Sequence, residues 1–404
     1  MNESLAVDRK PQVPVSLEAE LFARARAIAP VIERESPKSQ ALGELTPAAV
    51  GALKEAGLFW MWTPRHLGGA DISLSGGIRV IEEITRADGS AGWCLMANAG
   101  AISIAASFLG DAARKAMFGG TELPIVAGMF GPAGKSSKVP GGYQAGGRFA
   151  FGSGTAHAAW IAAGMLVMED GKPKMLPTGI PEVRVCFIPK GKFELQGGWD
   201  VIGLSGTGSY NYEIPEQFVA DDFTMERTSS EADAVLAPSP DIVTLGTCSH
   251  AAVALGLMKR ALQEIIQIAR FKKRPNYSKP LAENDVFKQE FSMNEAAYQA
   301  ARDYVLHVFD DIDATLRSGV RLSLAQRARM RQSCTWSHRV AEDVIRFAHR
   351  WGGAIAVRNP TNLGRATMDM AVVINHITVD PSTLTDAAPA IMNEWLSDMA
   401  IQQS

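Results

Sequence analysis

Two short segments, more than two hundred residues apart, carry the residue types best suited to chemistry in this chain of 404 residues. The first runs from Phe151 to Trp160 and places Ser153, whose hydroxyl can donate or accept a hydrogen bond, between two glycines. The second runs from Arg365 to Asp369 and is followed by His376. An imidazole titrates near neutral pH, so His376 can take a proton from a substrate or orient it.

Each segment also has a purely structural interpretation. Serine and glycine are common turn residues, so Gly152 to Gly154 can be a β-turn and nothing more. His376 stands seven residues after Asp369, which is two turns along one face if the segment is helical. A histidine there can simply pack at a helix end and bond to a carbonyl group. The residue types alone leave both interpretations open.

Composition argues against several classes of function. The 40 Lys and Arg residues are balanced by 43 Asp and Glu, so no basic excess attracts the chain to nucleic acid or to anionic membranes. The cysteines are far apart, with no CxxC pair and no Cys/His cluster, which argues against a zinc site and a disulfide framework and fits a reducing cytoplasm. They are Cys94, Cys186, Cys248 and Cys334.

No segment of the sequence predicts targeting to a membrane. Residues 1–14 are polar and lack the apolar core of a secretory signal. The longest apolar stretch, from Ala91 to Leu109, is interrupted by Asn98 and Ser107, so we expect a buried helix there and not a membrane span. We therefore expect a cytoplasmic protein with no membrane partner and no resident metal.

Hydrophobic periodicity divides the chain into three parts. From Ser16 to about Gly119, apolar residues recur at spacings of three and four, and Thr46 followed by Pro47 is typical of a helix start. From Pro124 to about Met225, short apolar runs alternate with glycine and proline turns, which predicts an antiparallel β domain that forms a compact barrel. After a polar linker from Ser229 to Pro240, the helical periodicity returns.

The last part is predicted to hold long helices over Ile242–Phe271, Asp285–Arg317 and Leu322–Trp351, and another that begins near Asn362. Their alanine-rich faces favour close antiparallel packing. The predicted fold class is therefore α+β. Its three domains are an N-terminal helical domain over residues 1–122, a β-barrel domain over 123–228 and a C-terminal four-helix bundle over 238–404.

This order of elements resembles the acyl-CoA dehydrogenase fold over nearly the whole chain. The motifs are most similar to those of the two-component, group D flavin-dependent monooxygenases of that fold, which include hydroxyphenylacetate and hydroxysteroid hydroxylases and dibenzothiophene monooxygenase. The segments that carry the resemblance are Phe149 to Gly154 with His157 and Trp160, Gly203 to Ser209, Trp351 to Gly353, and Leu363 through Asp369 to His376.

One position separates the two activities of this fold. A typical acyl-CoA dehydrogenase resembling this chain has its catalytic glutamate eight residues after the aspartate, where Ile377 stands here, and no acidic residue lies between Asp369 and Asp380. Some dehydrogenases place the glutamate on an earlier C-terminal helix, and Glu264 keeps that alternative open. The histidine at position 376 favours hydroxylation through a C4a-hydroperoxyflavin.

The resemblance also implies roles for individual residues. His376 is the base or orienting group, and Ser153 lies beside the flavin N5 and holds the hydroperoxide against loss of hydrogen peroxide. Met368 departs from the family pattern, in which an arginine is usual, and this makes the pocket more apolar there. The expected flavin-binding residues are Ser153 and Gly154, the aromatic residues Trp93, Phe130 and Trp160, and a phosphate-binding group of Arg274, Arg350, Gly352 and Gly353.

The chain is predicted to need a partner. Gly203 to Gly208 is not a GxGxxG motif and opens no helix, so no nicotinamide-binding Rossmann unit is expected. The resemblance then implies a separate NAD(P)H-flavin reductase that supplies reduced FMN or FAD, with O2 and a small aromatic, heteroaromatic or alicyclic substrate, and a homotetramer. The alternatives are a flavin dehydrogenase without oxygen insertion and a ligand-binding protein that has lost catalysis.

Overall fold

A computed structural model of the chain describes residues 16–230, 233–235, 238–358 and 361–401. The expectation of a polar segment without a signal over residues 1–14 lies outside the described residues. The linker expected from Ser229 to Pro240 lies partly outside them.

The N-terminal part is helical, as expected. Side chains cap its helices: Ser16 accepts a hydrogen bond from the amide of Ala19, and Thr46 accepts one from the amide of Ala49. Gly57 follows the second helix in the left-handed region, with φ 76°. The elements are α1 (Leu17–Leu42), α2 (Pro47–Glu55), the 3-10 helices η1 (Leu58–Trp60) and η2 (Arg65–Leu67), α3 (Leu74–Ala87), α4 (Gly89–Phe108) and α5 (Asp111–Phe118).

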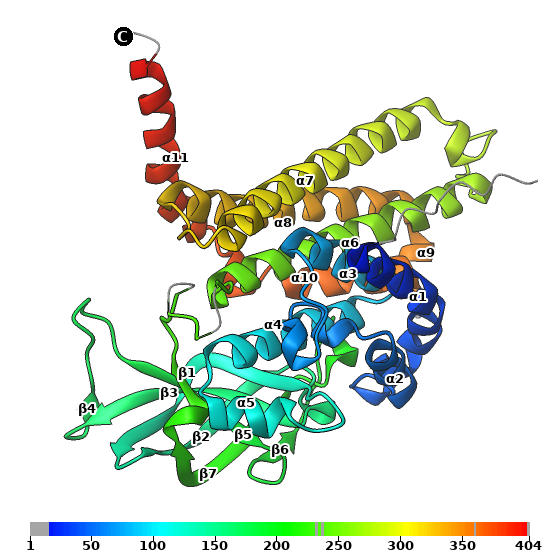
Figure 1. Cartoon of the computed structure of the whole chain (residues 1–404). Helices are drawn as coiled ribbons and strands as arrows, with labels where there is room; N and C mark the ends of the chain where they lie inside the picture. Colours follow the sequence, from blue (N-terminus) through cyan, green and yellow to red (C-terminus); the bar gives the residue numbers. More distant parts are fainter. Residues whose placement is uncertain (1–15, 231–232, 236–237, 359–360, 402–404) are drawn as a thin grey trace, which may run out of the picture.

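Strands follow in the middle of the chain and form one eight-stranded sheet in the order β6-β7-β2-β1-β3-β5-β8, with β4 paired to β3. Figure 1 shows the sheet below the helices, with α4 and α5 lying against it. The strands are β1 (Val126–Val139), β2 (Gly142–Gly152), β3 (Trp160–Glu169), β4 (Lys172–Pro173), β5 (Val183–Pro189), β6 (Glu194–Gly197), β7 (Tyr210–Ala220) and β8 (Thr224–Glu226). The short helices η3 (Thr155–His157), η4 (Ser205–Thr207) and η5 (Asp221–Phe223) lie between them.

The sheet is rich in antiparallel pairs but differs from the expected barrel in two details. β1 and β3 are parallel, because the chain returns along β2 before it enters β3. Hydrogen bonding among the described strands leaves β6 and β8 as open edges, so the ladder is not closed into a ring. A second hydrophobic core, with Phe149, Ile161 and Tyr212 among its members, fills the inside of the bent sheet.

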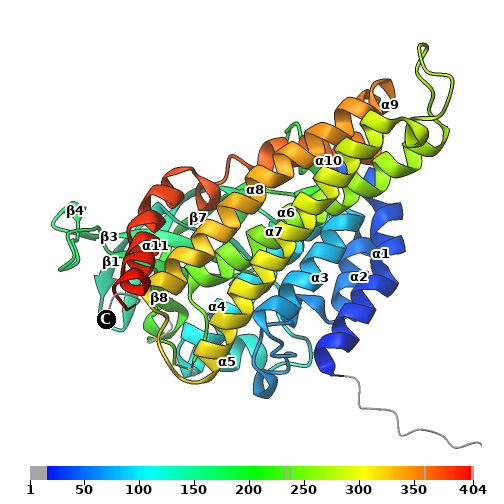
Figure 2. The same ribbon diagram turned by 90° about the horizontal axis from the view of Figure 1, so that it is seen from above.

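The C-terminal part is again helical. Two of the predicted ranges, Ile242–Phe271 and Asp285–Arg317, coincide with the helices α6 and α7. Figure 2 shows α6, α7 and α8 running side by side, with α3 next to them. The other elements are η6 (Leu281–Glu283), α8 (Leu324–Gly352), α9 (Ala354–Val357), α10 (Asn362–Val373), η7 (Ile377–Val379) and α11 (Ser382–Ile401).

The expected four-helix bundle is therefore built mainly from three long helices. α10 packs across α6 and α8, whereas the main contact of α11 is with α8 alone. In Figure 1, α11 stands away from the rest of the molecule and ends near the C-terminus. The outer face of α11 exposes large apolar side chains: Met392, Trp395, Leu396 and Met399.

Two helices, α4 and α6, are long and apolar enough by composition to cross a membrane. In the most apolar window of each, 83% of α4 and 78% of α6 is buried by the rest of the protein. Their composition is thus accounted for by packing in the core, as predicted for the stretch from Ala91 to Leu109.

Candidate active site

The hydroxyl of Ser153 lies at the centre of a row of hydrogen bonds. The turn between β2 and β3 carries Ser153, and the indole Nε1 of Trp93 on α4 donates to its Oγ at 3.0 Å. Ser153 Oγ is 2.7 Å from the hydroxyl of Ser209, which is 2.8 Å from that of Thr207. Thr207 in turn donates to the carbonyl oxygen of Leu204 at 2.7 Å. All three hydroxyl residues are buried.

The ring of Trp93 joins this hydroxyl to a group of histidines. Its ring centroid is 5.8 Å from that of His376, edge to face, and 5.0 Å from that of His250 on α6. The His250 and His376 rings are tilted by 31° to each other with centroids 4.1 Å apart, and His338 on α8 lies 6.3 Å from His250. Trp93 thus contacts both residues: its indole N–H bonds to Ser153, and its ring packs against that of His376.

His376 does not lie on the helix of Asp369. α10 ends at Val373, and His376 is the N-cap of η7, so the segment is not helical throughout and the placement two turns along one face does not apply. Asn375 and His376 leave the helix before a full second turn can form. His376 Nδ1 accepts a hydrogen bond from the amide of Thr378 at 3.2 Å. The proton of the neutral ring is therefore on Nε2, and this nitrogen is a donor.

All of the histidines of the site are held neutral. Burial lowers the pKa of His376 to about 4. Burial likewise lowers the pKa of His338 to about 4, although its bond to the Cys334 carbonyl opposes this. Burial lowers the pKa of His250 well below its usual value, and the neighbouring His376 and His338 add to this effect. Desolvation therefore keeps positive charge out of the site.

The turn that carries Ser153 is fixed by Asn98 of α4. The Asn98 amide donates to the carbonyl of Val126 at 3.0 Å and to that of Ser153 at 3.3 Å. Its oxygen faces Nε2 of His157 at 3.1 Å, which makes this nitrogen of His157 the donor. Gly154 has φ 76°, and an added Cβ would lie 2.6 Å from the Asn98 oxygen. Glycine is thus required at position 154 by both conformation and space.

An exposed aromatic ring lies two residues before Ser153. Phe151 is 67% exposed, although it is a large apolar side chain, and its backbone has φ 63°. A left-handed conformation is costly for such a residue and is found mainly where function or packing requires it. The Phe151 ring meets the edge of Trp199, and Ile202 nearby in the chain is 69% exposed. Phe151 and Ile202 thus each leave a large apolar side chain uncovered.

The loop from Gly203 to Ser209 is held against α10. The amide of Leu204 donates to Asp369 Oδ1 at 2.6 Å, and an added Cβ on Gly203 would lie 2.0 Å from the carbonyl oxygen of Met368. Burial raises the pKa of Asp369 to about 7, with a further contribution from the nearby Asp88 carboxyl. Asp369 therefore has a structural role here, because it ties the loop with Ser209 to the helix that leads to His376.

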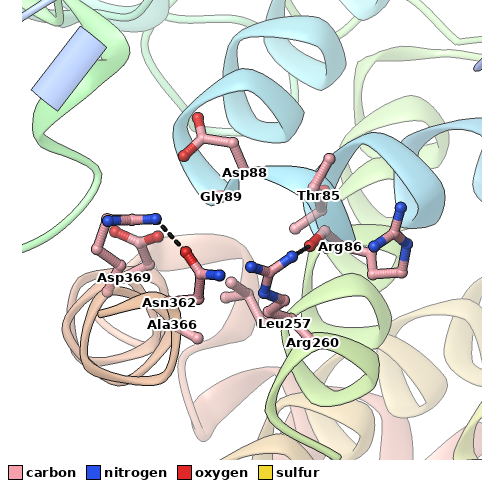
Figure 3. Close-up of a pocket in the computed structure, with 11 residues that line it drawn as sticks. Thr85, Arg86, Asp88, Gly89, Leu257, Arg260, Asn362, Ala366 and Asp369 are labelled. Atoms are coloured by element: carbon pink, nitrogen blue, oxygen red, sulfur yellow. Dashed lines mark hydrogen bonds between the residues drawn. The ribbon is translucent and has the colours of Figure 1, made fainter. Parts of the chain in front are cut away.

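Beside this junction lies a small polar cavity of about 10 Å³, between the start of α4, α6 and α10. Figure 3 shows Asp88 and Gly89 facing Asn362 and Asp369, with Arg260 at the side. The cavity is no larger than one water molecule, so it can hold neither a flavin nor an organic substrate. It is a packing junction between helices and not the active site.

The alternative base Glu264 lies at this junction and not at the site. Its carboxylate pairs with Arg260 at 3.0 Å and accepts a hydrogen bond from the Asn362 amide at 3.1 Å. Glu264 is 14 residues after His250 on α6, which is about 21 Å along the helix axis. Position 377 offers no substitute, because the Ile377 side chain is 81% exposed. The dehydrogenase alternative therefore has no carboxylate beside Trp93 and Ser153 among the described residues.

Two of the aromatic residues expected to bind flavin pack against other aromatic rings and not against Trp93. The Trp160 ring stacks on Phe223 with centroids 5.7 Å apart, and Phe130 meets Phe187 at 6.5 Å. Neither ring contacts Trp93 or the histidines among the described residues. The sequence could not separate them from Trp93, because an aromatic residue in a strand is equally suited to a core.

The expected phosphate-binding arginines lie at the far ends of α6 and α8. Arg274 stacks over the Trp351 ring at 4.3 Å, and Arg350 pairs with Glu290 at 2.5 Å. This corner also holds Gly352 and Gly353. The end of α6 lies about 32 Å from His250 along the helix, judged from the 21 residues between His250 and Phe271. These residues therefore do not belong to the Ser153 and His376 site of their own chain.

Sequence reasoning missed four residues of the site: Phe151, Thr207, Ser209 and His250. Phe151, Thr207 and Ser209 lie inside the motifs that carry the family resemblance, so closer attention to those motifs could have selected them. His250 gives no such signal, because a single histidine in an apolar helix reads as core.

Comparison with known proteins places this geometry in a family. The model described as acyl-CoA dehydrogenase, N-terminal domain, matches residues 18–118, and that described as acyl-CoA dehydrogenase, C-terminal domain, matches residues 248–381. Together they account for more than half of the chain. The chain belongs to the acyl-CoA dehydrogenase family.

Proteins of this family that are similar to the chain include oxygenases. The chain is 26% identical to indole-3-acetate monooxygenase of Pseudomonas putida over 84% of its length and 85% of the relative. It is also 26% identical to the oxygenase subunit HsaA, a flavin-dependent monooxygenase of Rhodococcus jostii, over 48% of its length and 49% of the relative. The comparison confirms the predicted family and favours an oxygenase over a dehydrogenase.

Solved structures of the family share the fold. The 3-HSA hydroxylase from Rhodococcus sp. RHA1 superimposes with a TM-score of 0.84 at 22% identity, covering 93% of this chain and 96% of the other. XiaF from Streptomyces sp., solved in complex with FADH2 and glycerol, superimposes with a TM-score of 0.81 at 19% identity, covering 93% and 96%. The predicted α+β fold class is thereby confirmed.

Proposed function

We propose that this chain is the oxygenase component of a two-component flavin-dependent monooxygenase that hydroxylates a small aromatic, heteroaromatic or alicyclic compound. The observation that carries this proposal is that Trp93 contacts both the Ser153 hydroxyl, at 3.0 Å, and the neutral His376 imidazole, with ring centroids 5.8 Å apart. No carboxylate bonds to any of these three residues in the described part of the chain. The site is therefore built to orient and hold protons without the strong base that abstraction from a thioester requires.

The residues present fit a flavin. A flavin ring is flat and largely apolar, with polar atoms along one edge. Phe151 and Ile202 expose apolar side chains, and Ser153, two residues after Phe151 in the chain, supplies a buried polar atom. Ser153 and Trp93 would lie along the N5 edge, and the backbone near Gly154 leaves room for close approach. Reduced flavin, when bound, supplies the two electrons that activate O2.

The overall reaction balances without any other oxidant. One atom of O2 enters the substrate as a hydroxyl group and the other leaves as water, while the reduced flavin is oxidised by two electrons. Of the two roles open to His376, the structure favours the orienting one, because Nδ1 is occupied by the Thr378 amide and Nε2 carries the proton. We propose that this N–H donates to an oxygen atom at the reaction centre and that Trp93 and His250 keep the ring in place.

The chain depends on reduced flavin from outside. Relatives that are named oxygenase subunits imply a separate flavin reductase, and the related XiaF was solved with FADH2. We propose that an NAD(P)H-flavin reductase supplies reduced FMN or FAD to this chain. The four cysteines are all free and buried, which supports our proposal that the protein acts in the cytoplasm.

Isotopic labelling tests the proposed function. The protein is mixed under 18O2 with a generic NADH-flavin reductase, FMN or FAD, and a panel of phenols, indoles and thiophenes. We expect mass spectrometry to show a product that has gained one 18O atom and depends on both reductase and O2. A product that is desaturated but unlabelled would instead identify a dehydrogenase, and oxidation of NADH without the reductase would contradict the need for a partner.

We further propose that the chain assembles as a homotetramer. The outer face of α11 exposes Met392, Trp395, Leu396 and Met399. This is an unusually large apolar surface for a helix that faces water. The corner around Arg274 and Arg350 is too far from His250 to serve the site of its own chain, but it is available to the site of a neighbouring subunit. Association would thus cover the apolar face and supply cations for the flavin phosphate.

The assembly is tested by its mass in solution. We expect light scattering after size exclusion to give four times the mass of the 43.4 kDa chain. Replacing Trp395 and Leu396 with Glu should reduce this mass, because charge on the apolar face opposes association. Replacing Asn393 with Glu on the same helix is the matched control. A wild-type protein that elutes as a monomer would refute the proposal.

A further inference from the structure

The hydroxyl row of the site has a direction that the distances determine. Each hydroxyl has one proton to donate. Thr207 Oγ1 lies 2.7 Å from the Leu204 carbonyl oxygen, and two oxygen atoms at this distance require a proton between them. A carbonyl has no proton, so Thr207 must donate. Thr207 can then only accept from Ser209, at 2.8 Å.

The same count continues to Ser153. Because Ser209 donates to Thr207, it can only accept from Ser153, at 2.7 Å. Ser153 thus donates its hydroxyl proton to Ser209 and also accepts a hydrogen bond from the indole N–H of Trp93 at 3.0 Å. One lone pair is left on Ser153 Oγ. Toward a bound flavin, Ser153 is therefore a hydrogen-bond acceptor and not a donor.

The row is held too firmly for its members to change partners. The Thr207 carbonyl accepts the amide of Gly154 at 2.9 Å, and the amide of Gly208 donates to the carbonyl of Gly43, the C-cap of α1, at 2.9 Å. Ser209 is 3% exposed and Thr207 1%, so water does not compete for their protons. The loop and the Ser153 turn are thus bonded to each other by their backbones as well as by their hydroxyls.

The two redox states of a flavin differ in what N5 presents. Reduced flavin has an N5–H group, which is a donor, whereas N5 of oxidised flavin has only a lone pair. An acceptor at Ser153 is complementary to the reduced state and faces a lone pair in the oxidised state. We propose that Thr207 and Ser209 are positioning residues that hold Ser153 as an acceptor, and that they thereby make the site select reduced over oxidised flavin. This inference rests on the proposed function, in which Ser153 lies at N5.

Substitution of Thr207 tests the inference through binding and not turnover. Thr207→Val keeps the shape and removes the hydroxyl, so the Ser209 proton can turn to Ser153 and free the Ser153 proton for donation. The Leu204 carbonyl keeps its bonds to the Trp199 indole at 3.0 Å and to the backbone amide of residue 207 at 3.1 Å, so no buried acceptor is left unpaired. Thr207→Ser is the matched control, because it keeps the hydroxyl.

Dissociation constants for oxidised and for anaerobically reduced FAD and FMN are measured by titration. We expect the wild-type protein and Thr207→Ser to bind reduced flavin more tightly than oxidised flavin. In Thr207→Val, the ratio of the dissociation constant of oxidised flavin to that of reduced flavin should fall about tenfold, since one hydrogen bond is worth about 1.4 kcal/mol. In a two-electron couple, tenfold corresponds to a shift of about 30 mV in the potential of the bound flavin, toward that of free flavin. Ser209→Ala interrupts the same row and should lose a similar factor.

The outcomes separate the two proposals. If the wild-type protein binds reduced flavin and forms 18O product while Thr207→Val and Ser209→Ala keep the wild-type ratio with unchanged circular dichroism, the inference is overturned and the oxygenase function stands. A wild-type protein that shows no redox preference also overturns the inference alone. If the wild-type protein binds no flavin in either state, both proposals fall.

Discussion

Replacing His376 with alanine is expected to lower the rate of substrate hydroxylation by about two orders of magnitude or more, which is the usual loss when a hydrogen-bond donor is removed from a reaction centre. His376 lies 5.8 Å from Trp93 and 4.1 Å from His250, measured between ring centroids, so its ring is packed against both of these rings. Rates are measured as labelled product per minute with excess reductase. His307→Ala, on the exposed face of α7, is the control and should have wild-type activity.

A second substitution separates the two roles of the imidazole. His376→Gln keeps an N–H donor but removes the basic nitrogen. If His376 orients the reacting oxygen by donating a hydrogen bond, His376→Gln should be at least tenfold more active than His376→Ala. Equal loss in both variants would contradict donation and restore the role of base.

The pH profile gives an independent check of His376. Burial lowers its pKa to about 4, so the neutral donor is present at every pH above that value and activity should be flat from pH 6 to 8. An acid limb near the ordinary histidine pKa of about 6.5 would contradict this environment. The lowered pKa of His376 also makes the folded state less stable at acid pH. The unfolded chain takes up protons below about pH 6.5 that the folded chain accepts only near 4, so unfolding becomes easier as pH falls through this window. Rates should therefore be compared at pH 6 or above.

Replacing Gly203 with alanine is the other change with a large expected effect. The new Cβ would lie 2.0 Å from the backbone oxygen of Met368, and a backbone atom cannot move aside as a flexible side chain can. The loop must then leave α10 and break the bond from the Leu204 amide to Asp369, which is 2.6 Å long. We expect a loss of about 1–3 kcal/mol in the free energy of unfolding from this overpacking.

The displaced loop also carries Thr207 and Ser209 away from Ser153. We therefore expect Gly203→Ala to form labelled product at a rate at least tenfold lower than the wild-type protein. More of the reduced flavin should be oxidised without hydroxylation, so that O2 is reduced to hydrogen peroxide. Urea denaturation measures the stability, and a peroxide assay measures the uncoupling. Gly51→Ala is the matched control. Nothing lies within 4 Å of the added Cβ there, and alanine stabilises an α-helix by about 0.5–1 kcal/mol over glycine. A Gly203→Ala protein with wild-type stability and coupling would show that the contact with Met368 does not constrain the loop.

Much of the fold could be predicted from local patterns. The helices over Ile242–Phe271 and Asp285–Arg317 were predicted to the residue, because their periodicity is long and their caps are strong. The parallel pairing of β1 with β3 could not be predicted, since a run of apolar residues does not specify its partner strand. The open edges of the sheet and the isolated position of α11 depend in the same way on contacts between distant segments.

The features of the site can also be divided into those that the sequence determines and those that depend on tertiary contacts. The presence of a histidine at 376, of isoleucine at 377 and of a glycine-flanked serine at 153 is decided by the sequence, and with the family resemblance these residues indicated an oxygenase. Only the tertiary structure decided that His376 lies beyond the end of α10, that His250 packs against it, and that Thr207 and Ser209 extend the hydrogen bonds of Ser153. The reason is physical. Residue types determine which chemistry is available, whereas the packing of the His376 ring and the bond between Ser153 and Ser209 depend on neighbours that lie about fifty to more than a hundred residues away in the chain.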